Sequence, residues 1–586
     1  MDLQYYHLAY YSWDLALYAH LMWNLCHGSM STSLFGGNFL MDHFNGIAFL
    51  LVPFYYFFQS ALTLLYFKLF AFFAGAYVFY LLVNKRLGGL WGIAFMLGYI
   101  FYPANVTMLF FEFNFENLAL PLIFLLFYFF EEKKFLCFMG TCFLLAIVKE
   151  NMPLVVFMVG IYGFMERRED WLRWGLYPLL LGAGMFFIEV FVIIPYFRQG
   201  LGTGNAYWYL YSNLGHSPQE IFRTLITNEP KVLHLLFNNH NAVFLSKLFG
   251  PLLIAALMSW QILLIAFPLF LQNLLSSFSG QQSIDYFYSS TLTVFIFMAA
   301  INFLGRINLK AIRLTITFFV FIFLVIFDLK YIPQWRVRMV PFEEKQAAAQ
   351  YLLSQIPQGA KVVSSYKFLD LLSQRKDLGI LLHKRQEFLY QQDINPQIAD
   401  YIIADFANRV DGKDAVKRVL ANGLWKVQAA ADEVVLLRKN RAQGEALIKF
   451  GNATYNHSSS YSHLSNYRHP ERSEGSQEVL QMEGLEVPNS LKFDQRILPV
   501  VFYWKALKDD GNSNLPQVSL NILQGFGRFY LKNTAPLYGL PLKKGEYYRQ
   551  VFYYLIPRLS PGNYKVAVTA QSGEYIQNIT IEKPLE

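Results

Sequence analysis

The chain has 586 residues, of which 55% are hydrophobic and only 15% are charged, and its formal net charge is +8. This composition excludes a single soluble globule, because the apolar excess is concentrated in the first 330 positions. The positive charge is scattered and forms no basic stripe interleaved with aromatic residues, so nucleic acid is not an expected partner. Cys26, Cys137 and Cys142 have no CxxC spacing, which argues against a cysteine metal site or a disulfide framework.

Long apolar runs predict helices that cross a membrane. Runs such as 61–83 and 174–196 can cross roughly 30 Å of hydrocarbon as helices. In lipid the backbone must satisfy its own hydrogen bonds, which favours helices for such runs. The sequence therefore predicts a polytopic α-helical membrane protein of about ten spans, at 61–83, 88–103, 117–130, 135–148, 151–165, 174–196, 243–258, 262–278, 286–303 and 313–330.

The positions of lysine and arginine beside these spans predict their orientation. Four charged turns, at 85–86, 131–134, 166–173 and 306–313, are expected on the cytoplasmic side. The connections between them, and the tail after 331, then face outward.

Two further segments are expected to lie in the outer membrane interface. Segment 14–28 has aromatic residues and His20 at the level of the headgroups, and 46–58 is short and broken by Pro53. Residues 1–13 lack a basic start and an apolar core, so we expect no cleavable signal peptide. The expected location is therefore a plasma membrane.

The composition changes after residue 330, which ends the expected membrane domain, 1–330. Segment 331–445 alternates helix-like and strand-like pieces and predicts a small extracytoplasmic α/β domain. Segment 446–477 is expected to be a linker, since its core is rich in Ser, Asn, His and charge. Short alternating runs separated by Pro and Gly turns in 478–586 predict a β-sandwich.

Ionisable residues gather in the segments that are expected to face outward. Placing an ionisable group in or near a membrane costs free energy, so each such residue is expected to have a structural or functional role. Glu112 and Glu116 are four residues apart, which would place both carboxylates on one helix face. The others are Asp14, Asp42, His43, Lys149, Glu150, Arg198 and Asp285, with Tyr286 and Tyr288 beside the last.

A site of this composition suits the transfer of a sugar from a lipid phosphate to an acceptor. The reaction needs a carboxylate to take the acceptor's proton. It also needs positive charge, from Lys, Arg or a metal, to neutralise the departing phosphate.

Each of these residues also has an ordinary structural explanation. Acidic residues in outer loops are commonly just solvated, and Asp14 could cap the helix that follows it. Lys149 and Glu150 could be a simple charge pair in a turn, and His43 a polar interfacial residue.

Four segments in fixed order carry a family resemblance: WDLALYAHLMWN (13–24), LFGGNFLMDHF (34–44), FEFNFENLALP (111–121) and AIVKEN (146–151). Over about residues 5–410 the chain resembles the DUF2079 family of predicted bacterial and archaeal membrane proteins. Where that family often has His-Tyr, this sequence reads Tyr286-Phe287-Tyr288. The family is similar to the GT-C glycosyltransferases, multi-span enzymes that use polyprenyl-phosphate sugars.

The resemblance implies a role for each motif residue. Asp14 is implied as the carboxylate that activates the acceptor and Glu116 as a second carboxylate. The residues implied to contact lipid phosphate or substrate are Lys149, Glu150, Tyr286 and Tyr288. Asp42 and His43 are implied at a phosphate or metal site, with Mg or Mn as the expected divalent ion.

Three functions stay open on the sequence. The first is a membrane glycosyltransferase that moves a sugar from a lipid-linked donor to a glycan, lipid or protein acceptor. The second is a transporter of a lipid-linked precursor, although the sequence shows no visible internal repeat. The third is a non-catalytic envelope assembly or binding protein, favoured by the large C-terminal part.

Overall fold

The computed structural model describes residues 13–198, 208–337, 349–381 except 351, 395–405, and, beyond these, mainly strands as far as residue 581. The contacts divide the chain into two units. Unit 1 comprises Met1–Tyr5, Tyr10–Thr32 and Gly36–Val340, and unit 2 comprises Tyr6–Ala9, Ser33–Phe35 and Pro341–Glu586. The predicted linker 446–477 lies outside the described residues.

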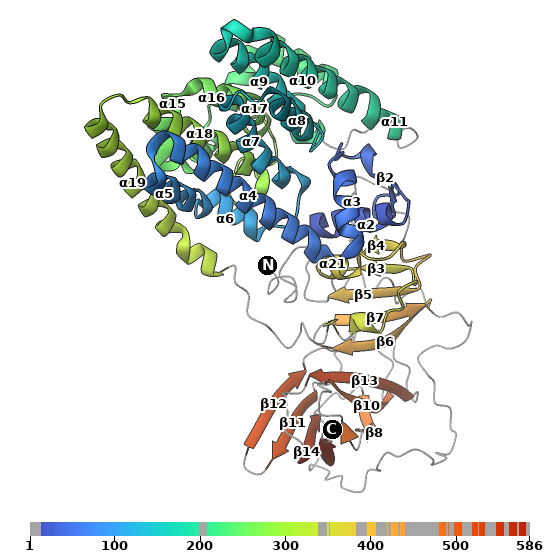
Figure 1. Ribbon diagram of the computed structural model, residues 1–586. Helices are drawn as coiled ribbons and strands as arrows, with labels where there is room; N and C mark the ends of the chain where they lie inside the picture. Colours follow the sequence, from blue (N-terminus) through green and yellow to red (C-terminus); the bar gives the residue numbers. More distant parts are fainter. Residues whose placement is uncertain are drawn as a thin grey trace. The chain divides into compact units, whose positions relative to one another are not determined.

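Unit 1 is helical apart from the short strands β1 (Ser31–Thr32) and β2 (Gly37–Asn38) (Figure 1). Its first helices are α2 (Trp13–Cys26), α3 (Ala48–Phe57), α4 (Ala61–Leu87), α5 (Gly89–Ile100), α6 (Pro103–Phe110), α7 (Ala119–Glu131), α8 (Phe135–Ala146) and α9 (Met152–Glu166). A continuous helix of α10 (Tyr177–Phe187) and α11 (Ile194–Phe197) with the π-helical turns η4 (Leu172–Leu176) and η5 (Ile188–Ile193) follows. The remaining helices are α12 (Pro218–Thr227), α13 (Glu229–Leu236), α14 (Asn239–Phe249), α15 (Leu253–Leu257), α16 (Trp260–Ile265), α17 (Phe267–Leu274), α18 (Ser290–Arg306) and α19 (Lys310–Val337).

Every predicted span falls on one or more of these helices, but they differ in length. Five segments of the described chain are long and apolar enough to cross a membrane: Ala61–Leu87, Leu172–Phe197, Asn239–Leu257, Phe287–Arg306 and Lys310–Ile332. The pair α5 and α6, bent by 52° at Tyr102 and Pro103, would make a sixth. Helices α7, α8 and α9 have 13, 12 and 15 residues. At 1.5 Å per residue they are shorter than roughly 30 Å of hydrocarbon, so the count of ten spans stays a prediction.

The charged turns that the sequence groups on one side are joined to one another. Lys85 Nζ donates to Glu132 at 2.6 Å, and Arg86 pairs with Glu131. Arg306 reaches Glu166 at 3.5 Å. The Lys85–Glu132 and Arg306–Glu166 pairs are partly exposed and contribute little stability, whereas the Arg86 and Glu131 side chains are only 17% and 21% exposed. The pairs join the first charged turn to the second and the third to the fourth.

Helix α9 packs closely on the helix that follows it because both carry glycine at the crossing. A Cβ added at Gly163 would lie 1.8 Å from the Trp174 carbonyl oxygen. A Cβ at Gly182 would lie 2.4 Å from the Phe157 nitrogen. Small residues let two backbones approach in this way within a membrane, where no hydrophobic effect drives helices together.

Replacement of Gly182 is expected to open this crossing. Gly182→Ala places a methyl group against backbone that cannot move aside, which costs about 1–3 kcal/mol. Gly184→Ala in the same helix is the matched control, because nothing lies within 4 Å of its added Cβ. Thermal unfolding of the purified protein in detergent should show a lower midpoint for Gly182→Ala alone. Equal midpoints would contradict the close packing.

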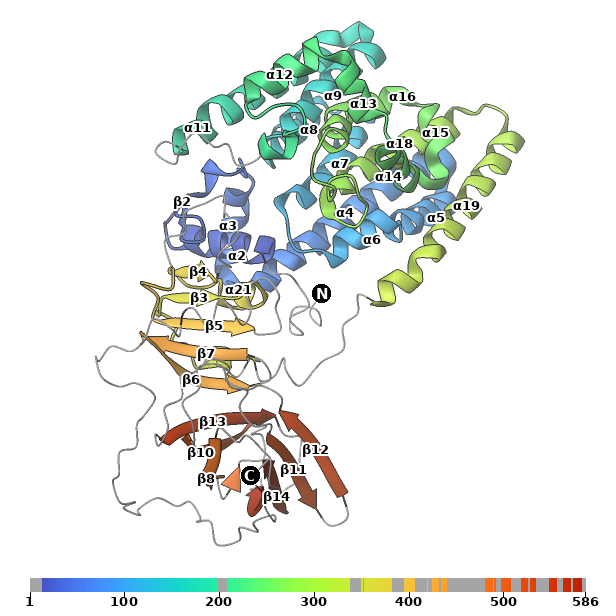
Figure 2. The ribbon, with the colours of Figure 1, turned by 180° about the vertical axis from the view of Figure 1, so that it is seen from behind.

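Unit 2 contains two sheets. The first has the order β4-β3-β5-β7-β6-β13-β10-β8, of which the run β4 to β6 is visible in both views (Figures 1 and 2). Strands β3 (Val362–Ser364), β4 (Leu378–Ile380) and β5 (Tyr401–Asp405) are parallel, and β6 (Trp425–Ala431) and β7 (Val434–Lys439) continue them antiparallel.

The later strands of unit 2 divide between the two sheets. β8 (Leu480–Glu486), β10 (Ile497–Ala506) and β13 (Tyr547–Leu555) complete the first sheet, where Phe552 pairs with Ala430. The second has the order β12-β11-β14-β15-β9, from β12 (Gly527–Asn533), β11 (Val518–Gln524), β14 (Gly562–Ala570), β15 (Gly573–Ile581) and β9 (Ser490–Leu491). The boundaries predicted at 331–445 and 478–586 stay predictions.

Candidate functional site

The first turn of α2 carries Asp14 and is held by a carboxylate from a distant segment. Glu112 Oε2 accepts a hydrogen bond from the Leu15 N–H at 2.8 Å. The first N–H groups of a helix have no partner within the helix, and a carboxylate there also suits the helix dipole. Glu112 therefore fixes the start of the helix that presents Asp14.

The expectation that Glu112 and Glu116 share one helix face is wrong. Residues 112–114 are not helical, and Glu116 lies in a separate short 3-10 helix, η2 (Phe115–Leu118). Asn114 caps η2, with its Oδ1 accepting from the Glu116 N–H at 3.1 Å. The turn between the two acids directs them to different partners.

A buried lysine anchors the segment that leads to these acids. Lys68 of α4 is completely buried, and its Nζ donates to the carbonyl oxygens of Met108, Leu109 and Phe111 at 3.3, 3.1 and 2.6 Å. These carbonyls close the end of α6, where the helix leaves its own acceptors unpaired. Our sequence analysis did not single out Lys68, although a lone lysine within an apolar run was an available signal.

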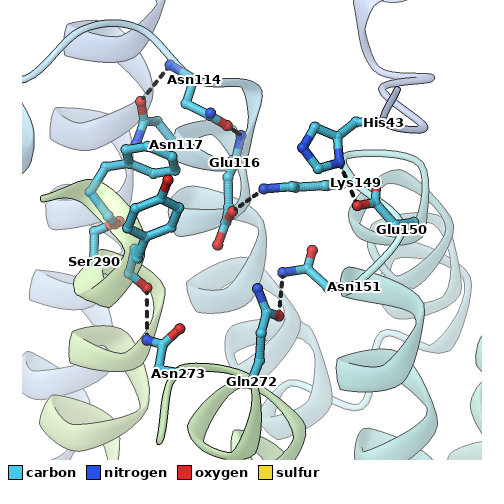
Figure 3. Close-up of polar contacts among 12 residues, drawn as sticks. His43, Asn114, Glu116, Asn117, Lys149, Glu150, Asn151, Gln272, Asn273 and Ser290 are labelled. Carbon is cyan, nitrogen blue, oxygen red and sulfur yellow. Dashed lines mark hydrogen bonds and ion pairs between the residues drawn. The ribbon is translucent and has the colours of Figure 1, made fainter. Parts of the chain in front are cut away.

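Glu116 forms a buried ion pair with Lys149. Lys149 Nζ lies 2.9 Å from Glu116 Oε2, and the two side chains are only 7% and 4% exposed (Figure 3). Burial alone would lower the pKa of Lys149, but the charges of Glu116 and Glu150 outweigh it and raise that pKa. Lys149 is therefore expected to be a charged ammonium group at neutral pH.

Glu150 pairs with His43 and not with its neighbour Lys149. His43 Nδ1 lies 2.6 Å from Glu150 Oε1, and the other carboxylate oxygen accepts from the Phe44 N–H at 3.1 Å. Burial opposes both charges, yet the pair lowers the pKa of Glu150 and, with the help of Asp42, raises that of His43. Glu150, for which a simple turn pair with Lys149 was the alternative explanation, thus ties segment 39–44 to segment 149–150.

Asp14 lies within electrostatic range of these ion pairs. Burial raises its pKa from the ordinary 3.8 to about 6, although the charges of Lys149 and His43 act to lower it. Asp42 adds to the increase. The structure thus brings Asp14, Asp42, His43, Glu116, Lys149 and Glu150 into one electrostatic cluster, from segments up to 136 positions apart.

The two tyrosines predicted at the site lie on an aromatic surface. The rings of Tyr286 and Tyr288 have centroids 6.4 Å apart, and Phe278 contacts both. Tyr288 is close enough to Asp14 and Glu116 for their charges to act on its phenol. Tyr286 is 37% exposed. His20, expected in the interface, is instead completely buried and contacts Asn24 at 3.2 Å.

The residues at this site do not form a recognisable metal site. Within the described part of the chain, no group of three or more His, Cys, Asp and Glu side chains is arranged to hold an ion. Nδ1 of His43 is already engaged by Glu150. The Mg or Mn expected at Asp42 and His43 therefore stays a prediction, and Lys149 supplies positive charge among the described residues.

These features define a helical membrane protein with a cluster of acidic and basic groups close to the ends of its helices. The family model described as "Predicted membrane protein (DUF2079)" matches residues 4–436, and the chain belongs to this family. The resemblance inferred from the four motifs is thereby confirmed.

Two solved structures of ArnT from Cupriavidus metallidurans are similar to this chain, one bound to undecaprenyl phosphate and one in the apo state. Their sequence identities are 10% and 11%, and both have a TM-score of 0.44. The likeness covers 74% of this chain and 96% of the ArnT chain in each case. No curated protein matches the chain in sequence.

Breaking the buried pair by one partner is expected to be costly. Lys149→Met leaves the Glu116 carboxylate buried and unpaired, which should destabilise the protein by about 3–5 kcal/mol. The double variant Lys149→Met/Glu116→Gln should regain most of that loss. Lys85→Met is the matched control, because its pair with Glu132 is 48% and 32% exposed and contributes under about 1 kcal/mol. Denaturant unfolding in detergent measures all three, and equal losses for Lys149→Met and Lys85→Met would contradict the pairing.

Proposed function

We propose that this protein transfers a sugar from a polyprenyl-phosphate-linked donor to a glycan, lipid or protein acceptor at the outer face of the bacterial plasma membrane. One observation supports this most directly. The carboxylate of Asp14, with a pKa of about 6, lies in the field of a buried and charged Lys149. A base and a cation within electrostatic range of each other match the two demands of the reaction. The likeness of the family's motifs to GT-C enzymes suggests the same class.

In the proposed reaction Asp14 takes the acceptor proton and Lys149 acts on the departing phosphate. The acceptor hydroxyl oxygen bonds to the anomeric carbon of the sugar while the bond from that carbon to the phosphate oxygen breaks. The acceptor proton passes to Asp14, which must be ionised to receive it. Lys149 neutralises the charge that develops on the departing polyprenyl phosphate. Glu116 and the His43–Glu150 pair hold the cation and the 39–44 segment in place.

The membrane placement is part of the proposal. With ten spans and the basic turns at Lys85, Arg86 and Arg306 on the cytoplasmic side, the cluster around Lys149 lies at the outer face. The C-terminal unit is then extracytoplasmic and close to the acceptors that the envelope provides.

One observation favours the alternative of a transporter for a lipid-linked precursor. Glu189 and Asp328 are buried carboxylic acids within segments long enough to span the membrane. Neither oxygen of Glu189 has a hydrogen-bond partner within the described residues. Intramembrane acids of this kind are common in proteins that move ions or polar substrates.

The Asp14→Asn variant tests the proposed reaction. It keeps the shape of the side chain but removes the base, so kcat should fall by roughly 10²-fold to 10⁴-fold. Release of undecaprenyl phosphate from a radiolabelled undecaprenyl-phosphate sugar in proteoliposomes measures it. Asp170→Asn is the matched control, because Asp170 is an exposed acid in the charged turn at 166–173. Undiminished release by Asp14→Asn would reject its role as base, and lipid movement without release would support the transporter.

The rate should depend on pH through Asp14. Because its pKa is raised to about 6, the fraction of ionised base falls as the pH drops through 6. We therefore expect kcat/KM to decline tenfold per pH unit below about 5.5 and to be flat above 7. A pH profile of initial rates between pH 4.5 and 8 measures this, with thermal unfolding at each pH to control for loss of fold. A rate unchanged down to pH 4.5 would contradict the assignment.

A further inference from the structure

Four carboxamide side chains lie around the Glu116–Lys149 pair. Asn117 is adjacent to Glu116 in η2, and Asn151 follows Lys149 by two residues. Gln272 and Asn273 come from α17. Figure 3 shows the Gln272 and Asn151 side chains below the Glu116–Lys149 pair, with Asn151 hydrogen-bonded to Gln272. Three distant segments thus contribute the same uncharged functional group.

These carboxamides are held in place by their own contacts. Asn151 Nδ2 donates to Gln272 Oε1 at 3.1 Å, and the main-chain carbonyl oxygen of Gln272 accepts from the Tyr211 hydroxyl at 3.3 Å. Asn273 Nδ2 donates to the Tyr288 carbonyl at 3.3 Å. The group is therefore preorganised, and its amide planes are fixed before any ligand arrives.

Hydrogen-bonding capacity nevertheless remains unused. Asn117 is completely buried, yet its Nδ2 has no hydrogen-bond partner within the described residues. The same holds for the buried Oδ1 atom of Asn151. Buried polar atoms in folded proteins are nearly always paired, so an unpaired donor and an unpaired acceptor here point to a ligand that brings both.

The chemistry of this set favours hydroxyl groups. A hydroxyl both donates and accepts, whereas a carboxylate or phosphate only accepts and would want donors alone. Neither these carboxamides nor the residues that they hydrogen-bond to within the described part of the chain carry a positive charge. The aromatic surface of Tyr286 and Tyr288, whose backbone Asn273 contacts, offers an apolar face for the C–H side of a sugar ring.

We propose that Asn117, Asn151, Gln272 and Asn273 form the subsite that binds the hydroxyls of the transferred sugar, and that this sugar is neutral. The inference rests on the proposed function and adds the class of sugar to it. Lys149 then contacts the phosphate on one side of the glycosidic bond, and the carboxamides contact the ring on the other.

Binding of three lipids to the purified full-length protein tests the subsite. The probes are undecaprenyl phosphate, its neutral glucose conjugate and its anionic galacturonate conjugate, with affinities measured by native mass spectrometry. We expect the glucose lipid to bind about tenfold tighter than bare undecaprenyl phosphate, the gain of one or two added hydrogen bonds. The galacturonate lipid should bind no tighter than the bare lipid.

Two variants of Gln272 make the test specific. Gln272→Met removes both polar atoms, while Gln272→Glu keeps an acceptor for Asn151 and loses the donor. Both should reduce the ratio of glucose-lipid to bare-lipid affinity to about one. Gln59→Glu, the same change far along the chain in the segment before α4, should keep the ratio, and thermal unfolding checks the fold of each variant.

The outcomes separate the two proposals. If the wild-type protein binds bare undecaprenyl phosphate but the sugar adds nothing, the subsite is refuted and the proposed function survives. A preference for the galacturonate lipid, or an unchanged ratio in both Gln272 variants, refutes the neutral subsite as well. If none of the three lipids binds, the proposed function itself fails, and the subsite fails with it.

Discussion

The buried ion pair between Glu116 and Lys149 is the interaction on which the site depends. Two charges removed from water are unfavourable unless each satisfies the other, so the pair fixes the distance between the segments before α7 and α9. Once that distance is set, His43 can reach Glu150, and Asp14 comes under the influence of Lys149. The contact between Glu116 and Lys149 therefore brings the Lys149 cation, the His43–Glu150 pair and the Asp14 carboxylate into one site.

The sequence was sufficient to predict a helical membrane part, strand-rich C-terminal segments and the motif residues that meet. Apolar runs and charged turns are local signals, and the pairs at Lys85, Arg86 and Arg306 join the turns that the sequence had grouped. The span count could not be tested in the same way, because α7 to α9 are shorter than the hydrocarbon they were expected to cross.

The partners of individual side chains were beyond the sequence. Glu112 and Glu116 looked like neighbours on a helix, but residues 112–114 are not helical and the two acids have different partners. Gln272 and Asn273 drew no attention, since a carboxamide in an amphipathic helix carries no charge signal. Only their contacts with Asn151 and Tyr288 connect them to the ion pairs.

The contact between Glu112 and α2 is made to the main chain of residue 15, not to its side chain. Any amino acid with an N–H can in principle serve that contact, provided that it fits the apolar surroundings of Leu15. Proline is the exception because it has no backbone N–H, although proline is otherwise common in the first turn of a helix. Among related chains that keep the acid at 112, the avoidance of proline at 15 would be the visible trace of this bond.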